Sequence, residues 1–258
     1  MKDTSFNGRS AKFASNIYGT SKGKVREAVL WHQISTHLLP TMAPSTRVLD
    51  AGGGQGQMAM RLAAEGHDIV LTDLSEEMLA AAKERAQALG LAQRFRFLPG
   101  PIQSLDAHKL GQFEVMLCHA VLEWCANPRE VLAALADHLS PGGALSLAFF
   151  NYQGAELHNL VAGNFDNLGA AMTQSKTRRV RMVPQNPLRN EEVAGWLTAL
   201  GLTIEHQCGV RVIHDYLRDK SQQNTQLDRL IELELSYCDR PLYRDIGRYT
   251  HFLVRKPG

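Results

Sequence analysis

The sequence predicts an α/β protein with a Rossmann-like, seven-stranded, mostly parallel sheet and helices on both of its faces. Three observations support this prediction. Short apolar runs alternate with amphipathic stretches in β-α-β order. The first run leads directly into a glycine-rich segment, Asp50 to Gly56. With 258 residues, 44% of them hydrophobic, the chain is also long enough to bury one large core.

Seven segments have the length and apolar pattern of strands, and five stretches have the 3.6-residue periodicity of helices. The strands are expected at 46–51, 67–73, 94–98, 112–118, 144–149, 202–210 and 248–254. The helices are expected at 55–65, 75–89, 128–139, 190–200 and 226–238. Ser75 has the side chain of an N-cap, and Glu76 and Glu77 would stabilise the first turn of that helix. The turn Pro141-Gly142-Gly143 should introduce the fifth strand.

Two segments fit this alternation poorly, and they define the expected organisation of a single domain, 1–258. Residues 1–45 are predicted to be an N-terminal cap, and residues 151–189 an insertion after the fifth strand, on the substrate side. Residues 46–150 would form the cofactor-binding core, and residues 190–258 the C-terminal part of the sheet.

Composition excludes several classes of protein. The N-terminus MKDTSFNGRSAKF has no apolar core of a signal peptide, and no run approaches the roughly 18 apolar residues of a membrane span. We therefore expect a soluble, cytoplasmic protein. The four cysteines form no C-x-x-C pair and the histidines no H-E-x-x-H motif, so we expect reduced thiols, no disulfide framework and no metal.

The small net charge of +2 hides an uneven distribution of charge. Residues 1–47 carry seven Lys/Arg against two Asp/Glu, whereas residues 48–150 carry seven against twelve. The stretch 176–189 holds five basic residues and no acid. Positive charge therefore lies outside the glycine-bearing core, as expected if two basic segments border a site for an anionic macromolecule.

The glycine loop distinguishes between two kinds of cofactor. A dinucleotide fingerprint has the pattern G-x-G-x-x-G/A. If Gly52 is its first residue, the sixth position must be Gly or Ala, but this chain has Gln57 there. The pattern that fits is D-x-G-x-G-x-G, beginning at Asp50. A carboxylate there would repel pyrophosphate but could serve an ammonium group or a loop amide. Asp73, at the end of the second predicted strand, can accept hydrogen bonds from both ribose hydroxyls. Together these features predict S-adenosylmethionine as the ligand.

At this level the segments VLDAGGGQG, VLTD, FEVMLCHAVLEW and LSPGGALSL resemble the class I S-adenosylmethionine-dependent methyltransferases. The flanking segments NIYGTSKGKVREAVLW, HAVLEW, HNLVAGNFD and GVRVIHDYLRDK are similar to the family of bacterial tRNA 5-carboxymethoxyuridine methyltransferases. With them the resemblance spans nearly the whole chain. It implies methylation of the carboxylate of 5-carboxymethoxyuridine at the tRNA wobble position, which gives the methyl ester and S-adenosylhomocysteine.

The resemblance also implies roles for individual residues. Arg26 would reach the methionine end of the cofactor, where a guanidinium suits a carboxylate. Gly52 and Gly53 would line the cofactor, and Asp73 would hold the ribose. The remaining implied contacts are Ile102 and Gln103 beside the adenine and His119 at the end of the fourth strand. The wider class commonly has an acid that reads the adenine amino group, and the Gln103 amide would take its place here.

Reaction chemistry gives an independent indication of the acceptor. Methyl transfer from a sulfonium is an in-line displacement that depends on alignment. A carboxylate is ionised at neutral pH and needs no general base, whereas phenols usually do. Apart from His119 the sequence offers no convincing base, which favours an anionic nucleophile. Candidates for orienting it are Tyr18, Lys22, Arg211, His214 and Tyr216.

An anticodon stem-loop would bring phosphates to the border of such a pocket. Lys176, Arg178, Arg179 and Arg181 would contact it on one side, and Lys22 and Lys24 on the other. Two alternatives stay open at this point: a methyltransferase for a small-molecule carboxylate, hydroxyl or ring carbon, and a non-catalytic S-adenosylmethionine-binding module. The G-x-S-x-G match Gly19 to Gly23 lacks the preceding buried strand of a serine hydrolase elbow, so it does not indicate a hydrolase.

Overall fold

The computed structural model describes residues 3–5, 8, 19–169, 172 and 186–258. The described residues form a seven-stranded sheet of order β3-β2-β1-β4-β5-β7-β6. Its strands are β1 (Arg47–Ala51), β2 (Asp68–Asp73), β3 (Phe95–Pro99), β4 (Phe113–His119), β5 (Leu139–Phe150), β6 (Thr203–Val210) and β7 (Tyr249–Arg255). All pairs from β3 to β5 are parallel, and β7 is antiparallel to both β5 and β6.

Helices connect the strands. The longer ones are α2 (Ser21–Gln33), α3 (Gln57–Ala64), α4 (Glu76–Ala88), α5 (Pro128–His138), α6 (Tyr152–Val161), α8 (Asn190–Ala199) and α10 (Leu227–Tyr237). Shorter turns of helix are η1 (Ile34–Leu38), η2 (Leu39–Thr41), η3 (Ala92–Arg94), η4 (Ile102–His108), η5 (Leu122–Trp124), η6 (Phe165–Asn167), η8 (His214–Tyr216) and α9 (Gln222–Thr225).

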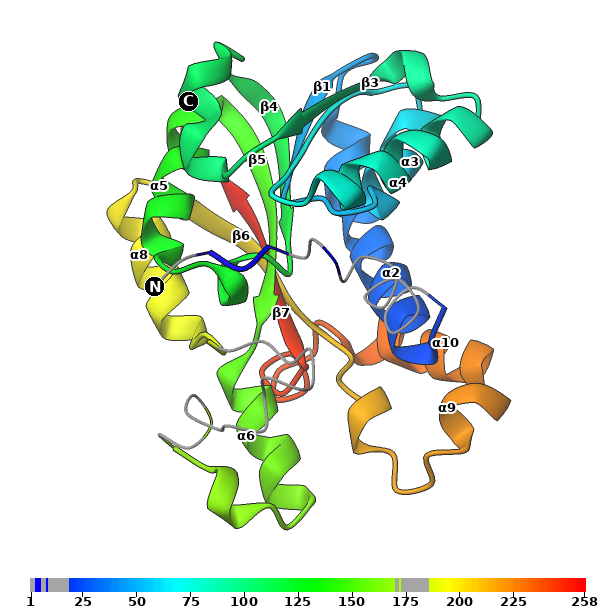
Figure 1. The fold of residues 1–258 in the computed structure, drawn as a ribbon. Coiled ribbons are helices and arrows are strands. Elements are labelled where there is room, and N and C mark those ends of the chain that lie inside the picture. The colour runs from blue at the N-terminus through cyan, green and yellow to red at the C-terminus, as the bar shows by residue number, and fades with distance from the viewer. Residues whose placement is uncertain (1–2, 6–7, 9–18, 170–171, 173–185) are drawn as a thin grey trace.

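The sheet separates two hydrophobic cores, because its central strands are apolar on both faces. One core packs the sheet against α2, α3, α4 and α10, and the other packs it against η4, α5 and α8. Figure 1 shows the two helical layers on opposite sides of the strands, with α6 extending beyond one end of the sheet. The Rossmann-like, mostly parallel sheet that the sequence predicts is therefore confirmed.

Most predicted elements occur within a few residues of their expected bounds, and the local reasons are visible. The Ser75 hydroxyl accepts a hydrogen bond from the Met78 amide at 3.3 Å and so caps α4 as expected. The fifth strand differs from its prediction, because β5 already begins at Leu139 and runs through the turn at Pro141. The register with β4 shifts there, and Gly142, whose φ is +75°, donates its amide to the Lys256 carbonyl at 2.9 Å instead.

The described part of residues 1–45 does more than cover an edge. Val25, Val29, Leu30 and Ile34 are buried, so α2 and the start of η1 belong to one of the two cores. The Thr20 hydroxyl caps α2 by accepting a hydrogen bond from the Gly23 amide at 3.3 Å. The segment predicted as a cap therefore contributes a helix to the covering layer of the sheet.

The directions of the strands determine which loops lie together at one edge of the sheet. The carboxyl ends of β1 to β6 face one edge of the sheet. Because β7 is antiparallel, with Tyr249 opposite Phe150, its first residue lies at that same edge. The turns after six strands and the turn before the seventh therefore converge there, where parallel α/β sheets bind their ligands.

Candidate functional site

A pocket opens at the carboxyl ends of β1 to β4, with about 1100 Å³ of free space including its open side. Such a volume accommodates a nucleoside with an amino-acid tail. All seven residues predicted to contact the cofactor line this pocket: Arg26, Gly52, Gly53, Asp73, Ile102, Gln103 and His119. The structure therefore brings together residues from α2 and from the ends of four strands.

Two glycines make the floor of the pocket out of bare backbone. A Cβ on Gly53 would lie 2.5 Å from the carboxyl carbon of Asp50, and one on Gly52 would lie 2.7 Å from a methyl group of Val121. Gly52 also has a φ of +69°, which side chains rarely tolerate. The loop can therefore follow a flat ligand closely only while both positions remain glycine.

Two carboxylates stand at the base of this loop. Asp73 Oδ2 accepts a hydrogen bond from the Gly54 amide at 2.9 Å, and its Oδ1 accepts one from the Ser75 amide at 2.8 Å. Each oxygen keeps a further lone pair for a hydroxyl. Asp50 is buried, and burial together with the charge of Asp73 raises the pKa of its carboxyl to about 7.

The adenine side of the predicted site contains an acid that the sequence prediction did not include. The Gln103 side-chain amide donates a hydrogen bond to Asp3 Oδ2 at 3.0 Å, and Asp3 Oδ1 accepts one from the Ala126 backbone at 2.7 Å. Asp3 lines the pocket as well. Because the Gln103 NH₂ group faces Asp3, its Oε1 is left to accept a hydrogen bond from an exocyclic amino group.

His119 is held from behind by a hydrogen-bonded row of side chains. The Ser146 hydroxyl lies 2.8 Å from Nε2 of His119 and 2.8 Å from Nε2 of His251. A hydroxyl carries one proton, so it donates to one ring and accepts from the other. Burial lowers the pKa of His119 to about 3 and that of His251 well below its usual range, so both rings are neutral.

The surroundings of His251 indicate which group donates each of these hydrogen bonds. Its Nδ1 is buried and has no hydrogen-bond partner within the described residues. A lone pair without a partner costs less there than an N–H without one, so the proton of His251 sits on Nε2 and is donated to Ser146. Ser146 then donates to His119 Nε2. In that arrangement the proton of His119 is on Nδ1.

Beside the pocket lies a group of cations, here called the cation cluster: Lys22, Arg26, Arg211 and Arg248. The guanidinium carbons of Arg26 and Arg211 each lie 5.8 Å from the centre of the Tyr249 ring. That ring packs edge-on against Phe150, with centres 5.5 Å apart, and Arg248 lies 4.9 Å from the centre of the Phe150 ring. Partial burial and the neighbouring arginines lower the pKa of Lys22. The cluster thus continues outward from the pocket residue Arg26.

Arg211 is fixed in this cluster by a strong ion pair. Its Nε and Nη2 donate to the two carboxylate oxygens of Asp215 at 2.7 and 2.9 Å. Burial alone would raise the pKa of Asp215, but Arg211, His214 and Arg248 together outweigh that effect and hold it well below its usual range. Behind them Glu234 of α10 accepts hydrogen bonds from three successive backbone amides, residues 212–214, at 2.7 to 3.0 Å. The turn after β6 is therefore rigidly held.

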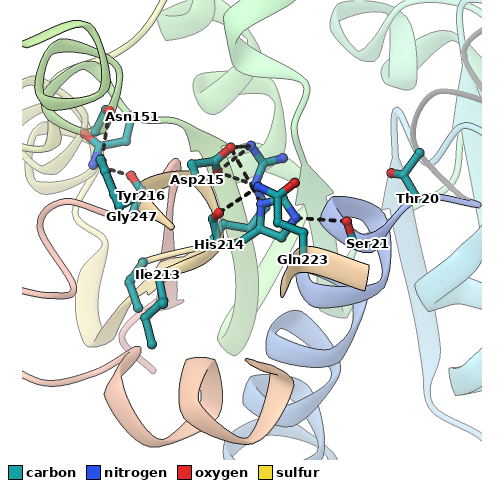
Figure 2. A network of polar contacts seen from close by, with 12 residues as sticks. Thr20, Ser21, Asn151, Ile213, His214, Asp215, Tyr216, Gln223 and Gly247 are labelled. Carbon is teal, nitrogen blue, oxygen red and sulfur yellow. Dashed lines mark hydrogen bonds and ion pairs between the residues drawn. The ribbon is translucent and has the colours of Figure 1, made fainter. Parts of the chain in front are cut away.

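His214 and Tyr216 belong to this support. His214 Nε2 is hydrogen bonded to the Ser21 hydroxyl at 3.1 Å, and the Gln223 side chain donates to the His214 carbonyl, as Figure 2 shows. The Tyr216 hydroxyl lies 2.7 Å from the Ile246 carbonyl and 3.0 Å from that of Gly154. Both side chains are thus hydrogen bonded within the protein, and their role in orienting the substrate stays a prediction.

Of the other predicted substrate and tRNA contacts, some lie within the described residues and some do not. Lys22 and Arg211 lie in the cation cluster. Tyr18 lies outside the described residues. The predicted tRNA contacts Lys176, Arg178, Arg179 and Arg181 lie outside them as well.

Comparison with known proteins decides the family. A model described as "Methyltransferase domain" matches residues 49–147. The tRNA 5-carboxymethoxyuridine methyltransferase of Escherichia coli (strain K12) is 44% identical over 257 residues, which cover 100% of this chain and 98% of that relative. The chain belongs to the tRNA 5-carboxymethoxyuridine methyltransferase family. It is an S-adenosylmethionine-dependent methyltransferase.

More distant relatives match a shorter part of the sequence, or the fold at low identity. The ubiquinone biosynthesis O-methyltransferase of Psychrobacter cryohalolentis is 34% identical over 105 residues, 41% of each chain. The crystal structure of magnesium protoporphyrin IX methyltransferase from Synechocystis PCC 6803 with bound SAH has a TM-score of 0.67 at 16% identity, and the match covers 98% of this chain and 96% of that one. Full-length identity therefore separates the tRNA 5-carboxymethoxyuridine methyltransferase family from the shared fold.

The sequence analysis expected no membrane span, no metal site and no disulfide framework. In the ranges that the structure describes, no helix is long and apolar enough to cross a membrane. No group of three or more His, Cys, Asp or Glu side chains that could hold a metal ion is found in those ranges either. All four cysteines are free and buried.

The sequence prediction missed two residues of the site. Asp3 stands far from any periodic element, so its approach to Gln103 depends on how the N-terminus crosses the pocket. Arg248 was recognised only as the first residue of a closing strand. Its place at the ligand edge depends on the antiparallel direction of β7, which apolar patterning does not reveal.

Proposed function

We propose that this chain transfers a methyl group from S-adenosylmethionine to the carboxylate of 5-carboxymethoxyuridine at the wobble position of tRNA. The observation that carries the proposal is the position of the cation cluster, which borders a pocket built for an uncharged nucleoside. Arg211 of this cluster is balanced by Asp215, which leaves excess positive charge for an anionic acceptor. The name of the full-length relative supports the same acceptor.

The residues of the pocket fit the cofactor. Gly52 and Gly53 would face its backbone, Asp73 would accept from the ribose hydroxyls, and Arg26 would pair with its carboxylate. Gln103, oriented by Asp3, would accept from the adenine amino group. When bound, the cofactor supplies a methyl group on a positively charged sulfur and leaves as the neutral thioether.

The acceptor needs no proton transfer. A carboxylate oxygen is already anionic at neutral pH, so the new C–O bond forms without a base. The pKa of His119, lowered to about 3 by burial, makes it a weak base and agrees with this chemistry. The residues around the site would therefore act by orienting the two reactants and excluding water.

The tRNA would extend beyond this pocket. The basic residues 176–181, which lie outside the described ranges, and Lys22 and Lys24 at the start of α2 are proposed to contact phosphates of the anticodon stem-loop.

Transfer of labelled methyl groups tests this function. The purified protein would be given tRNA from cells that make 5-carboxymethoxyuridine and from cells that cannot, together with a metabolite extract. We expect label in the first tRNA, released by mild base as expected for a methyl ester. Equal labelling of both tRNAs would reject the carboxylate acceptor, and label only in the metabolite extract would indicate a small-molecule substrate.

A further inference from the structure

Arg248 stands at a fixed place on the ligand edge of the sheet. It immediately precedes β7, whose first residue Tyr249 pairs with Phe150 at the end of β5. Its backbone amide donates to the Arg211 carbonyl at 3.4 Å, and its carbonyl accepts from the Asn151 amide at 3.1 Å. The turns after β5 and β6 thus hold the backbone of Arg248 from two sides.

The guanidinium of Arg248 has no hydrogen-bond partner in the described part of the chain. Its Nη1 is buried and unpaired, and none of the described residues accepts a bond from its other nitrogens. Its neighbour is the Phe150 ring, 4.9 Å away, which supplies no acceptor in its plane. Burial lowers the pKa of Arg248, the nearby charge of Asp215 opposes that effect, and the arginine keeps its charge. A guanidinium with a buried N–H that has no acceptor is costly even with Asp215 nearby, and an incoming anion would relieve that cost.

The other members of the cation cluster are placed differently. Arg211 already donates to both oxygens of Asp215. Arg26 lines the pocket assigned to the cofactor. Lys22 is exposed on α2 and carries a point charge without the planar fork of a guanidinium. Arg248 is therefore the member whose hydrogen-bonding capacity is both buried and unused by the described residues.

We propose that Arg248 is the residue that selects the acceptor by pairing its guanidinium with the carboxylate of the uridine 5-substituent. This inference rests on the proposed function and names the residue that gives it specificity. A bidentate pair places both carboxylate oxygens in the plane of the guanidinium and leaves each a second lone pair. A uridine whose 5-substituent lacks a carboxylate would leave the Arg248 charge unpaired and would bind less tightly.

The test compares two anticodon stem-loop RNAs that differ only in the 5-substituent of the wobble uridine, carboxymethoxy or methoxy. Dissociation constants are measured with S-adenosylhomocysteine present, so that no turnover occurs. Arg248→Gln removes the charge, and Arg248→Lys keeps it without the fork. Arg255→Gln is the matched control, because Arg255 ends the same strand at the opposite edge and pairs with Glu205 on the surface.

We expect the wild-type protein to prefer the carboxymethoxy RNA. Arg248→Gln should weaken binding of that RNA by about 10- to 100-fold and leave binding of the methoxy RNA unchanged. Arg248→Lys should restore only part of the preference, and Arg255→Gln should behave as wild type. Affinity for S-adenosylhomocysteine and the melting temperature show whether each variant is folded.

The possible failures are distinguishable. If Arg248→Gln is folded and keeps the wild-type preference, the role of Arg248 is overturned while the proposed function stands. If Arg248→Gln does not fold, Arg248→Lys decides, and a full preference in that variant overturns the bidentate pair. If the wild-type protein neither prefers nor methylates the carboxymethoxy RNA, the proposed function fails and this inference fails with it.

Discussion

The two halves of the ligand edge hold different kinds of ionisable group. At the ends of β1 to β4 the ionisable groups are mainly carboxyls, Asp50, Asp73 and Glu123, and Arg26 of α2 lines the same pocket as the first two. Around β5 to β7 the corresponding groups are Arg211 and Arg248, with Asp215 as partner of the first. The first half suits a ligand rich in hydroxyl and amino groups, and the second suits an anion. One sheet edge can thus bind two chemically different reactants side by side.

The acidic half has a measurable consequence for stability. Burial, and after it the charge of Asp73, raises the pKa of Asp50 from 3.8 to about 7 in the folded protein. The folded state therefore holds a proton that the unfolded chain has lost, and stability decreases as pH rises through this window. Asp50→Asn removes this loss. Its stability relative to wild type should rise by on the order of 4 kcal/mol between pH values of about 4 and 8.

Urea unfolding of the cofactor-free proteins across this pH range measures that difference. The exposed Asp166→Asn is the control, because its carboxylate lies in solvent near η6. Parallel curves for Asp50→Asn and wild type over the whole range would show that Asp50 is not held protonated by the fold.

The separation of the two halves is tested most directly at Asp73. Asp73→Ala removes the acceptor for the Gly54 and Ser75 amides and for the ribose hydroxyls. Affinity for the cofactor, measured by calorimetry, should fall by about 100-fold. Binding of the carboxymethoxy RNA without cofactor should not change, because the cation cluster is intact.

Asp68→Ala is the matched control for that variant, since Asp68 begins the same strand and forms a partly exposed ion pair with Arg94 at the opposite edge. A cofactor affinity within about threefold of wild type in Asp73→Ala would refute the role of Asp73. Parallel losses of cofactor and RNA binding would show that the two halves do not act separately.

The smallest effect is expected where the halves meet. Ser146 on β5 connects His119 of the cofactor pocket with His251 on β7. Ser146→Ala removes the hydroxyl that fixes the His119 proton on Nδ1. We expect cofactor affinity to fall by about 5- to 10-fold and the ¹⁵N NMR shifts of His119 to report the other tautomer.

Ser140→Ala, near the other end of β5, controls for the loss of a hydroxyl from that strand. A lower affinity in Ser146→Ala with an unchanged His119 tautomer would mean that Ser146 acts through packing alone. An unchanged affinity with a changed tautomer would mean that His119 does not donate to the cofactor.

Much of the cofactor half could be predicted because it is local in sequence. The loop from Asp50 to Gly56 and the acid Asp73 lie within one β-α-β unit, whose geometry is fixed by the right-handed crossover. All seven predicted cofactor contacts line the pocket. Gly52, Gly53 and Asp73 could be predicted from this unit, and the other four were predicted from the resemblance of the sequence to a known family. Their role in binding stays a proposal for the variants above.

The acceptor half could be predicted only in part. Lys22, Arg211, His214 and Tyr216 look equally suitable in sequence. The structure shows that His214 is hydrogen bonded to Ser21 and Tyr216 to the Ile246 carbonyl. The residue type alone does not show whether a His or Tyr side chain contacts a ligand or a backbone carbonyl. The difference arises from the packing of α2, α6 and α10 around the turn after β6.

The sequence by itself determined the seven strands, most of the helices, the glycine loop, the acid predicted to hold the ribose, and the family, because periodicity and short motifs depend on neighbouring residues. Only the tertiary structure decided that Asp3 meets Gln103, that Ser146 joins two histidines, and that Arg248 stands unpaired among the described residues beside Phe150. Each of these depends on strand order and direction, which bring together residues 27 to 105 positions apart, and no local pattern in the chain specifies such pairs.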